Sequence, residues 1–265
     1  MPRLRRTAYR SAAIIDQRRG AVNNGPFVLC YHSVSDSAWR FAVRPRDIIR
    51  QLNFLVASYT PVTATELEAF LTGSQDVAPH SFLITFDDGY RDILDCRTTF
   101  EKCGIKPLVF TLSEPNRALE TDIPAWNRLL GGDDLRSLAR DGWDIGSHSA
   151  THADLTALDD KALVAEVLES KQRIEDVLGS PVRYFAYPKG RYTSRVLRAC
   201  SSAGYAAAFS MDDGFISTTT NRFAIPRIGV DGTHSYQEFK TLMTPSCIRL
   251  RQIVKGSPLR RLLDY

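Results

Sequence analysis

Short apolar runs alternate with helical patterns along most of the chain, and this alternation is the feature that most restricts the fold. The apolar runs favour β-strands and lie at Phe27–His32, Pro61–Thr63, Phe82–Asp87, Lys106–Thr111, Trp143–His148, Arg183–Tyr187 and Ala206–Ser210. Helical patterns lie at Arg46–Ala57, Thr65–Leu71, Tyr90–Gly104, Asp133–Gly142, Asp159–Leu178 and Thr193–Ala203. About seven such alternations predict an α/β protein with a parallel sheet, either open and doubly wound or closed as a barrel.

The composition is that of an ordinary globular protein. Hydrophobic residues make up 43% of the 265 residues and charged residues 24%, and the net charge of +4 does not by itself indicate a nucleic acid partner. No run approaches the ~18 consecutive apolar residues of a membrane span. The basic start is not followed by a long apolar run, so we expect no secretory signal and a cytoplasmic location. The five cysteines form no Cys-x-x-Cys pair and are expected to be reduced thiols.

Both ends of the chain are basic. We expect a basic extension over residues 1–25, the main domain over residues 26–245 and a basic tail over residues 246–265. Such ends are either solvated tails or segments that contact an anionic membrane surface. Neither end has a clean amphipathic pattern, so the sequence favours solvated tails over peripheral membrane contact.

Two adjacent acids, Asp87 and Asp88, end one predicted strand in the sequence FLITFDDGY. Sites in parallel α/β folds form at the carboxyl ends of strands. At another strand end His148 and His152 lie four residues apart, a spacing that places two imidazoles on one side of a helical turn. Two imidazoles and one carboxylate are a common ligand set for Zn²⁺ and other divalent ions. We therefore predict a metal site of Asp88, His148 and His152, with Asp87 beside it as general base.

A third strand end, YFAYPKG at residues 184–190, breaks into a loop at Pro188. The backbone N–H groups of this loop are candidates for an oxyanion hole, because they can face the site and receive developing negative charge. A plain exit from a strand into a turn is the alternative.

The motifs TFDDG, SHSATH and FAYPKG, in this order, resemble those of the NodB-type polysaccharide deacetylases, the fourth carbohydrate esterase family. The resemblance extends from about Phe27 to Val230. It implies a distorted (β/α)₇ barrel, the NodB homology domain, and metal-dependent hydrolysis of an N-acetyl group from an N-acetylglucosamine unit. It also implies that Asp87 is the base, that Asp88, His148 and His152 bind the metal, and that the N–H of Lys189 helps to hold the oxyanion.

The chain departs from the main branch of that family at two points. Ala186 stands where the branch has an arginine set against the base, and Arg227 in AIPRIGV is a candidate for the missing charge. The late histidine, His234, is not on an apolar strand, whereas His32 ends the run FVLCYH. This order is similar to the poly-N-acetylglucosamine deacetylases, in which the first strand carries the histidine that protonates the leaving amine. We therefore favour His32 over His234 as the general acid.

The resemblance thus predicts a carbohydrate N-deacetylase that acts on an N-acetylglucosamine oligo- or polysaccharide, such as a chitooligosaccharide, and releases acetate. Zn²⁺ is the favoured metal, with Co²⁺ and Ni²⁺ as alternatives. Two other functions stay open: a deacetylase or deformylase of a lipid-linked or nucleotide sugar, and a carbohydrate-binding domain without catalysis. The candidates for stacking on sugar rings, with core packing as their alternative, are Tyr31, Tyr90, Trp126 and Tyr187.

Overall fold

A parallel sheet forms the centre of the protein, for which the computed structural model describes residues 2–19, 25–78, 80–119, 123 and 128–257. The strand order is β10-β1-β5-β6-β7-β8-β9, and the short β4 pairs with the start of β5. The strands of this sheet are β1 (Phe27–Tyr31), β4 (Thr60–Pro61), β5 (Ser81–Phe86), β6 (Leu108–Thr111), β7 (Asp144–Ser147), β8 (Tyr184–Ala186), β9 (Ala207–Phe209) and β10 (Ile228–Gly229). Every position of β1 and β5 is buried, as expected for parallel strands covered on both faces.

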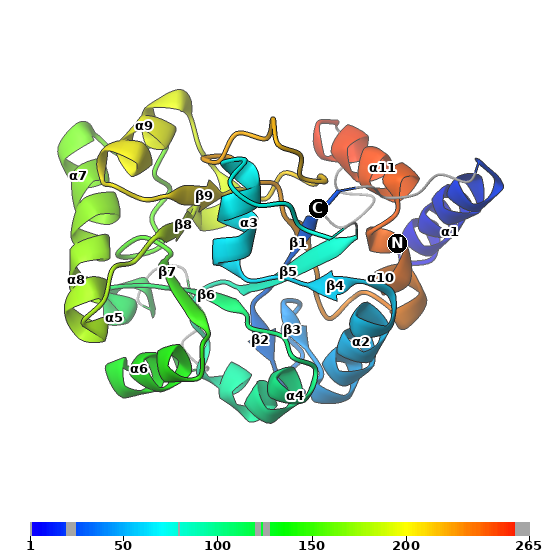
Figure 1. The fold of residues 1–265 in the computed structure, drawn as a ribbon, viewed down its shortest axis with the longest axis horizontal. Coiled ribbons are helices and arrows are strands. Elements are labelled where there is room, and N and C mark those ends of the chain that lie inside the picture. The colour runs from blue at the N-terminus through cyan, green and yellow to red at the C-terminus, as the bar shows by residue number, and fades with distance from the viewer. Residues whose placement is uncertain (1, 20–24, 79, 120–122, 124–127, 258–265) are drawn as a thin grey trace.

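The segment that leads into β10 links the two edges of the sheet. Ile225 forms a parallel bridge with Phe209 at the end of β9, and Ile228 pairs with Leu29 of β1. The sheet is therefore a distorted barrel, with helices arranged around its outside (Figure 1). The predicted α/β class and barrel-like architecture are confirmed.

The α-helices of the described chain surround the sheet (Figure 1). They are α1 (Pro2–Arg19), α2 (Pro45–Ser58), α3 (Ala64–Leu71), α4 (Arg97–Lys102), α5 (Pro115–Leu119), α6 (Gly132–Arg140), α7 (Asp160–Val164), α8 (Ser170–Leu178), α9 (Ser194–Ser202), α10 (Tyr236–Leu242) and α11 (Pro245–Lys255). The shorter turns are the 3₁₀ segments η1 (Arg91–Cys96) and η3 (Pro188–Gly190) and the π-helical segment η2 (Ala165–Glu169). The predicted helix Asp159–Leu178 is thus a continuous run of α7, η2 and α8.

The seven predicted strands are all present, each within two residues of its predicted ends. The sequence did not reveal β10 or the small pair β2 (Ser33–Val34) and β3 (Ala42–Val43), because a strand of two residues has no recognisable period. It also did not reveal the helices α1, α5, α10 and α11.

The two basic ends are not solvated tails, which corrects the favoured interpretation of the sequence. Tyr9 of α1 and Cys247 and Ile248 of α11 belong to the main hydrophobic core. The two helices also bond to each other, because Asp16 accepts hydrogen bonds from the backbone N–H and the hydroxyl of Ser246. The predicted domain boundaries stay a prediction, and residues 20–24 and 258–265 of the two basic ends lie outside the described residues.

No helix in the described part of the chain combines the length and the apolar character that crossing a bilayer requires. Of the five cysteines, Cys103 is partly exposed and the other four are buried, and all are free thiols.

The packing of α1 can be tested at its buried arginine. Arg5 donates to Glu238 of α10 and to the backbone and side chain of Thr233. We expect Arg5→Met to lower the free energy of unfolding by about 3 kcal/mol, because it leaves the carboxylate of Glu238 buried without its cation. The neighbouring change Arg6→Met, on an exposed side chain, should cost less than about 0.5 kcal/mol. Urea unfolding of both variants measures this, and equal effects would mean that α1 is not docked as described.

Candidate active site

The ends of strands β1, β5, β7 and β8 converge on one cavity of about 430 Å³. Because parallel strands all point the same way, the residues that follow them gather at one end of the barrel. The cavity is lined by six of the predicted site residues: His32 after β1, Asp87 and Asp88 after β5, His148 and His152 after β7, and Lys189 after β8. Arg227, which precedes β10, is fully buried behind this wall.

Asp88, His148 and His152 form a compact group of possible ligands. Their ligand atoms lie within 4.8 Å of one another. The Nε2 atoms of His148 and His152 are each 3.5 Å from Oδ1 of Asp88. Asp88 reaches this position because its backbone turns into the left-handed region, with φ of 68°, directly after the strand. Aspartate adopts this conformation more readily than most residues, and the glycine that follows, Gly89, continues it with φ of 71°.

The chemistry of this group fits a divalent cation. Oδ1 of Asp88 is buried and has no hydrogen-bond partner, an arrangement that costs free energy unless a cation satisfies the oxygen. Nδ1 of His148 lies 2.9 Å from the carbonyl oxygen of Ala186. A carbonyl only accepts, so Nδ1 carries the proton and the lone pair of Nε2 faces Asp88. Burial lowers the pKa of His148 to about 4, which keeps the ring neutral near pH 7, as a metal ligand must be.

Asp87 has a different set of partners from those of its neighbour. Arg227 donates from Nη1 to Oδ1 at 2.6 Å and from Nη2 to Oδ2 at 2.8 Å, a bidentate pair between two buried side chains. Burial alone would raise the pKa of Asp87, but the charge of Arg227 and its hydrogen bonds hold this pKa well below its usual value. Asp87 is therefore a carboxylate at neutral pH. The structure thus sets Arg227 against the predicted base, although Ala186 occupies the family's usual arginine position.

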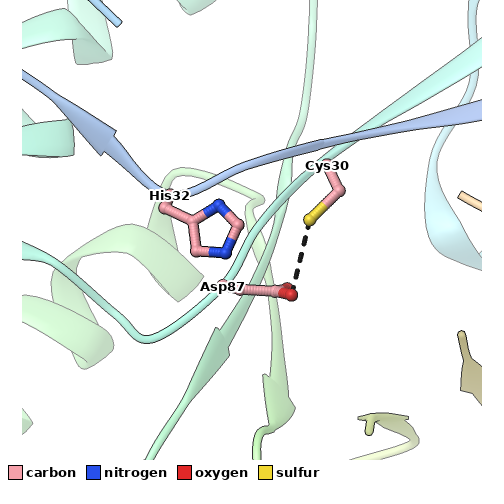
Figure 2. A group of neighbouring side chains, drawn as sticks. All are labelled: Cys30, His32 and Asp87. Atoms are coloured by element: carbon pink, nitrogen blue, oxygen red, sulfur yellow. Dashed lines mark hydrogen bonds between the residues drawn. The ribbon is translucent and has the colours of Figure 1, made fainter. Parts of the chain in front are cut away.

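Cys30 is a further neighbour of Asp87 that the sequence did not single out. Its thiol donates to Oδ2 of Asp87 over 3.4 Å, and His32 approaches the same carboxylate (Figure 2). The ligand atoms of Cys30, His32 and Asp87 also lie within 4.8 Å of one another. This second group is less suited to a cation, because Asp87 is already paired with Arg227. Burial also raises the pKa of the Cys30 thiol, which keeps it protonated.

The two candidate general acids differ in their surroundings. His32 borders the cavity beside Asp87, and its Nδ1 is buried without a hydrogen-bond partner. Its ring lies 4.9 Å from the ring of Phe41. His234 also borders the cavity, but its Nδ1 lies 3.1 Å from a carboxylate oxygen of Asp231, which holds it at the wall formed by the end of the chain. The structure therefore brings His32, and not His234, next to the predicted base.

The loop after β8 is shaped by unusual backbone angles. Lys189 has φ of 57° and Gly190 has φ of 66°. A side chain at Gly190 would collide with Met211, since an added Cβ would lie 2.4 Å from the Cβ of that residue. Lys189 in this tight turn lines the cavity, and the role of its N–H as oxyanion donor stays a prediction.

The aromatic residues at the cavity are mostly not the predicted ones. Tyr31 and Tyr187 belong to the core, and only Tyr90 of the described candidates borders the cavity; Trp126 lies outside the described residues. Trp39 and Phe41 instead form an aromatic wall with His32. They lie in the segment between β2 and β3, which the sequence showed only as a loop.

Glu166 anchors the loop that carries the two histidines, a role for which no sequence pattern is visible. Its carboxylate accepts from the N–H groups of Ala150 and Thr151, both at 2.9 Å, and from the hydroxyl of Thr151 at 2.6 Å. Ser149 and His152 in this loop both have positive φ, so the loop needs such anchoring. Glu166 lies in the π-helical segment η2, and such segments often occur beside functional sites.

Known proteins with similar sequences and folds agree with a deacetylase site at this position. Residues 74–208 match the polysaccharide deacetylase family model, a segment that contains the carboxylate pair, both histidines and the loop at Lys189. The chain belongs to the polysaccharide deacetylase family. It is therefore a carbohydrate deacetylase, as the sequence predicted.

Individual relatives of this deacetylase agree in fold. It is 26% identical over 205 residues to YxkH of Bacillus subtilis, named a polysaccharide deacetylase, an alignment of 77% of this chain and 70% of that protein. The Streptococcus pyogenes deacetylase PplD, solved in complex with acetate, superposes with a TM-score of 0.72 at 19% identity, over 84% of this chain and 100% of PplD. IcaB from Ammonifex degensii superposes with a TM-score of 0.67 at 21% identity, over 86% of this chain and 97% of IcaB. These structures support the barrel of the NodB-type deacetylases.

The role of Glu166 in the deacetylase can be tested by metal binding. Glu166→Gln removes acceptor capacity that the loop N–H groups and Thr151 use, so the two histidines should no longer be held together. We expect roughly tenfold weaker binding of Zn²⁺ or Co²⁺ to metal-free protein, measured by calorimetric titration. Glu169→Gln, one turn away on a half-exposed side chain, is the matched control and should bind as the wild type does. Unchanged affinity in Glu166→Gln would show that the loop does not depend on this carboxylate.

Proposed function

We propose that this deacetylase is a metal-dependent hydrolase that removes N-acetyl groups from N-acetylglucosamine units of an oligo- or polysaccharide and releases acetate. The observation that carries the proposal is that two adjacent buried carboxylates contact different residues. Asp87 is clamped by Arg227, whereas Asp88 faces His148 and His152 with a buried oxygen that lacks a donor. One acid is thereby available for proton transfer and the other for a cation.

Asp88, His148 and His152 would hold the metal ion. A divalent ion there supplies a Lewis acid that polarises the amide carbonyl and makes a water more acidic. This help matters because a carboxylate whose pKa is as low as that of Asp87 is a weak base on its own. Two imidazoles and a carboxylate suit Zn²⁺, which we favour, and also Co²⁺ and Ni²⁺.

The remaining steps use groups of the chain. Asp87 accepts a proton from the water that attacks the acetyl carbon, and Arg227 and Cys30 keep its two oxygens oriented. The backbone N–H of Lys189 stabilises the negative charge that develops on the acetyl oxygen. His32, in its protonated form, donates a proton to the departing sugar amine. The products are acetate and a free amine, with no covalent intermediate.

The residues that line the cavity support a sugar substrate, and they also fit a second class of substrate. Trp39, Phe41 and Tyr90 offer the aromatic surface on which sugar rings pack. The cavity is also lined by basic side chains, namely Arg40, Lys189, Arg251 and Lys255. A lipid-linked or nucleotide sugar with a phosphate beside the N-acyl sugar would use such side chains, and this is the alternative substrate class.

The base and the metal can be tested together. Short N-acetylglucosamine oligomers are incubated with metal-loaded protein, with chelated protein and with the Asp87→Asn variant, and acetate is measured. We expect chelation to abolish release and Asp87→Asn to lower kcat by at least about 100-fold, since it removes the general base. Asp95→Asn, on an exposed side chain of η1, is the control and should keep full activity.

Two results would contradict this mechanism. Equal acetate release by chelated and loaded protein would exclude metal dependence, and an active Asp87→Asn variant would exclude the assigned base. If the wild type binds metal but releases no acetate from these oligomers, the substrate belongs to the second class.

The choice of general acid needs a separate comparison. His32→Gln should lower kcat roughly 100-fold, because the departing amine then lacks its proton donor. His234→Gln should lower it by less than about fivefold, since that ring is held by Asp231 at the far wall. Both variants should bind Zn²⁺ as the wild type does, which separates loss of the acid from loss of the metal. The reverse order of activities would assign the proton donor to His234.

A further inference from the structure

The two terminal helices carry a charge that the rest of the chain does not share. Together α1 and α11 contain nine arginine and lysine residues and one acid, a net charge of +8. The whole chain carries only +4, so the remainder has a net charge of −4. Three of these charged side chains are buried and paired, because Asp16 accepts from Ser246, Arg5 donates to Glu238 and Arg251 donates to Asp213. The described basic side chains that are exposed on the two helices are Arg6, Arg10, Arg18, Arg249 and Lys255. The positive charge of this protein is therefore concentrated where its two ends meet.

The outer faces of the same helices also expose large apolar side chains. Among the described residues, seven large hydrophobic side chains are exposed, and four of them lie on these two helices. They are Leu4 (62% exposed), Ile14 (49%) and Ile15 (43%) on α1, and Ile253 (62%) on α11. Scattered exposed apolar residues need no explanation, but four on two adjoining helices do.

Helical spacing interleaves the apolar and basic residues. On α1, Arg10, Ile14 and Arg18 follow at intervals of four, and on α11 Arg249 and Ile253 have the same spacing, so each set shares one face. The opposite face of α1 is the one that packs inward through Arg5, Tyr9, Ala12 and Asp16. The exposed arginines and isoleucines are thus directed away from the core.

The two helices are adjacent, which makes their outer faces a single surface region. Besides the bonds of Ser246 to Asp16, Nη1 of Arg251 on α11 donates to the hydroxyl of Tyr9 on α1 at 3.1 Å. Figure 1 shows α1 and α11 beside each other at one side of the barrel, next to α10. We call the outer side chains Leu4, Arg6, Arg10, Ile14, Ile15, Arg18, Arg249 and Ile253 the terminal-helix face.

We propose that the terminal-helix face docks this protein on an anionic lipid bilayer. Arginines that pair with lipid phosphates around apolar side chains that enter the headgroup boundary are the features of an interfacial helix. The absence of any exposed acid on these helices complements a negatively charged leaflet. A second copy of the chain is the less suitable occupant, because two such faces would repel each other.

Docking in this way would bring the active site close to the membrane. The buried side chains Arg5, Tyr9 and Arg251 of the same helices line the cavity, and so does the exposed Lys255. The cavity wall and the lipid headgroups would therefore be separated by about one helix diameter, ~10 Å. The inference goes beyond the proposed deacetylation and stands whether or not N-acetylglucosamine is the substrate.

Vesicle sedimentation of the full chain tests the proposal. The protein is mixed with vesicles of phosphatidylcholine alone or of phosphatidylcholine with phosphatidylglycerol. We expect binding to the anionic vesicles only, and weaker binding as salt is raised. The variant Arg6→Glu/Arg10→Glu/Arg18→Glu should bind roughly 100-fold more weakly. A matched variant with three reversals on exposed residues of α4, α6 and α9, Lys102→Glu/Arg140→Glu/Arg198→Glu, should bind within about twofold of the wild type.

The apolar part of the face has its own comparison. Ile14→Ser/Ile253→Ser should weaken binding roughly tenfold, whereas Val164→Ser, which has the same exposed fraction as Ile14 but lies on α7, should have no effect. All variants should keep the wild-type circular dichroism and the wild-type activity on soluble oligomers, which separates docking from deacetylation.

Three outcomes would overturn the proposal. The first is a wild type that stays unbound with anionic vesicles or binds neutral vesicles equally well. The second is a loss of binding in the matched charge variant as large as that in the terminal-helix variant. The third is a wild-type dimer, seen by light scattering, that Ile14→Ser/Ile253→Ser converts to monomer without vesicle binding, which would make the face a contact between copies.

Discussion

The buried ion pair between Arg227 and Asp87 is the interaction on which both the barrel and the active site depend. Besides Asp87, the guanidinium donates to the carbonyl of Ser210 after β9 and to the hydroxyl of Thr85 in β5. Arg227 itself precedes β10, which pairs with β1, so one side chain joins both edges of the sheet. Removing either partner would leave an unpaired charge in the core, a loss of several kcal/mol. The same contact keeps Asp87 ionised, so the closed barrel and the ionised state of the proposed base depend on one contact.

The position of the adjacent carboxylate, Asp88, depends more on backbone geometry than on charge. Asp88 and His152, whose side chains face each other, both have left-handed backbone angles, as does Ser149, and such angles persist only where the surroundings enforce them. Thr111 lies so close to Gly89 that an added Cβ would be 2.8 Å from its hydroxyl, which excludes a larger residue there. On the other side, Glu166 anchors the histidine loop through three hydrogen bonds. The proposed metal ligands are therefore positioned by two constrained segments, the turn at Asp88 and Gly89 and the histidine loop.

The sequence predicted those parts of the protein that have a local signal. Long apolar strands and the spacing of His148 and His152 are local, and they led to the fold class and to the candidate ligands. The family resemblance pointed to Arg227 as the positive charge beside Asp87. Ala186 stands where the main branch of the family has an arginine, so another residue has to supply that charge. Cys30 and Glu166 were missed, since a single cysteine in a strand and a glutamate in a helix have no pattern. Their importance comes only from contacts 57 and 15 or 16 residues away in the chain.

The ends of the chain were misread for a specific physical reason. A helix is recognised when its inner face is apolar, but the inner face of α1 contains Arg5 and Asp16, whose burial is made possible by Glu238 and Ser246 far along the chain. The apolar residues Leu4, Ile14 and Ile15 are instead exposed. The apolar residues of α1 are thus divided between the inward face, with Tyr9 and Ala12, and the outward face, so no single buried stripe marks the helix in the sequence. Leaving the outward apolar side chains in water costs free energy, and a second, non-aqueous surface in contact with that face would remove this cost.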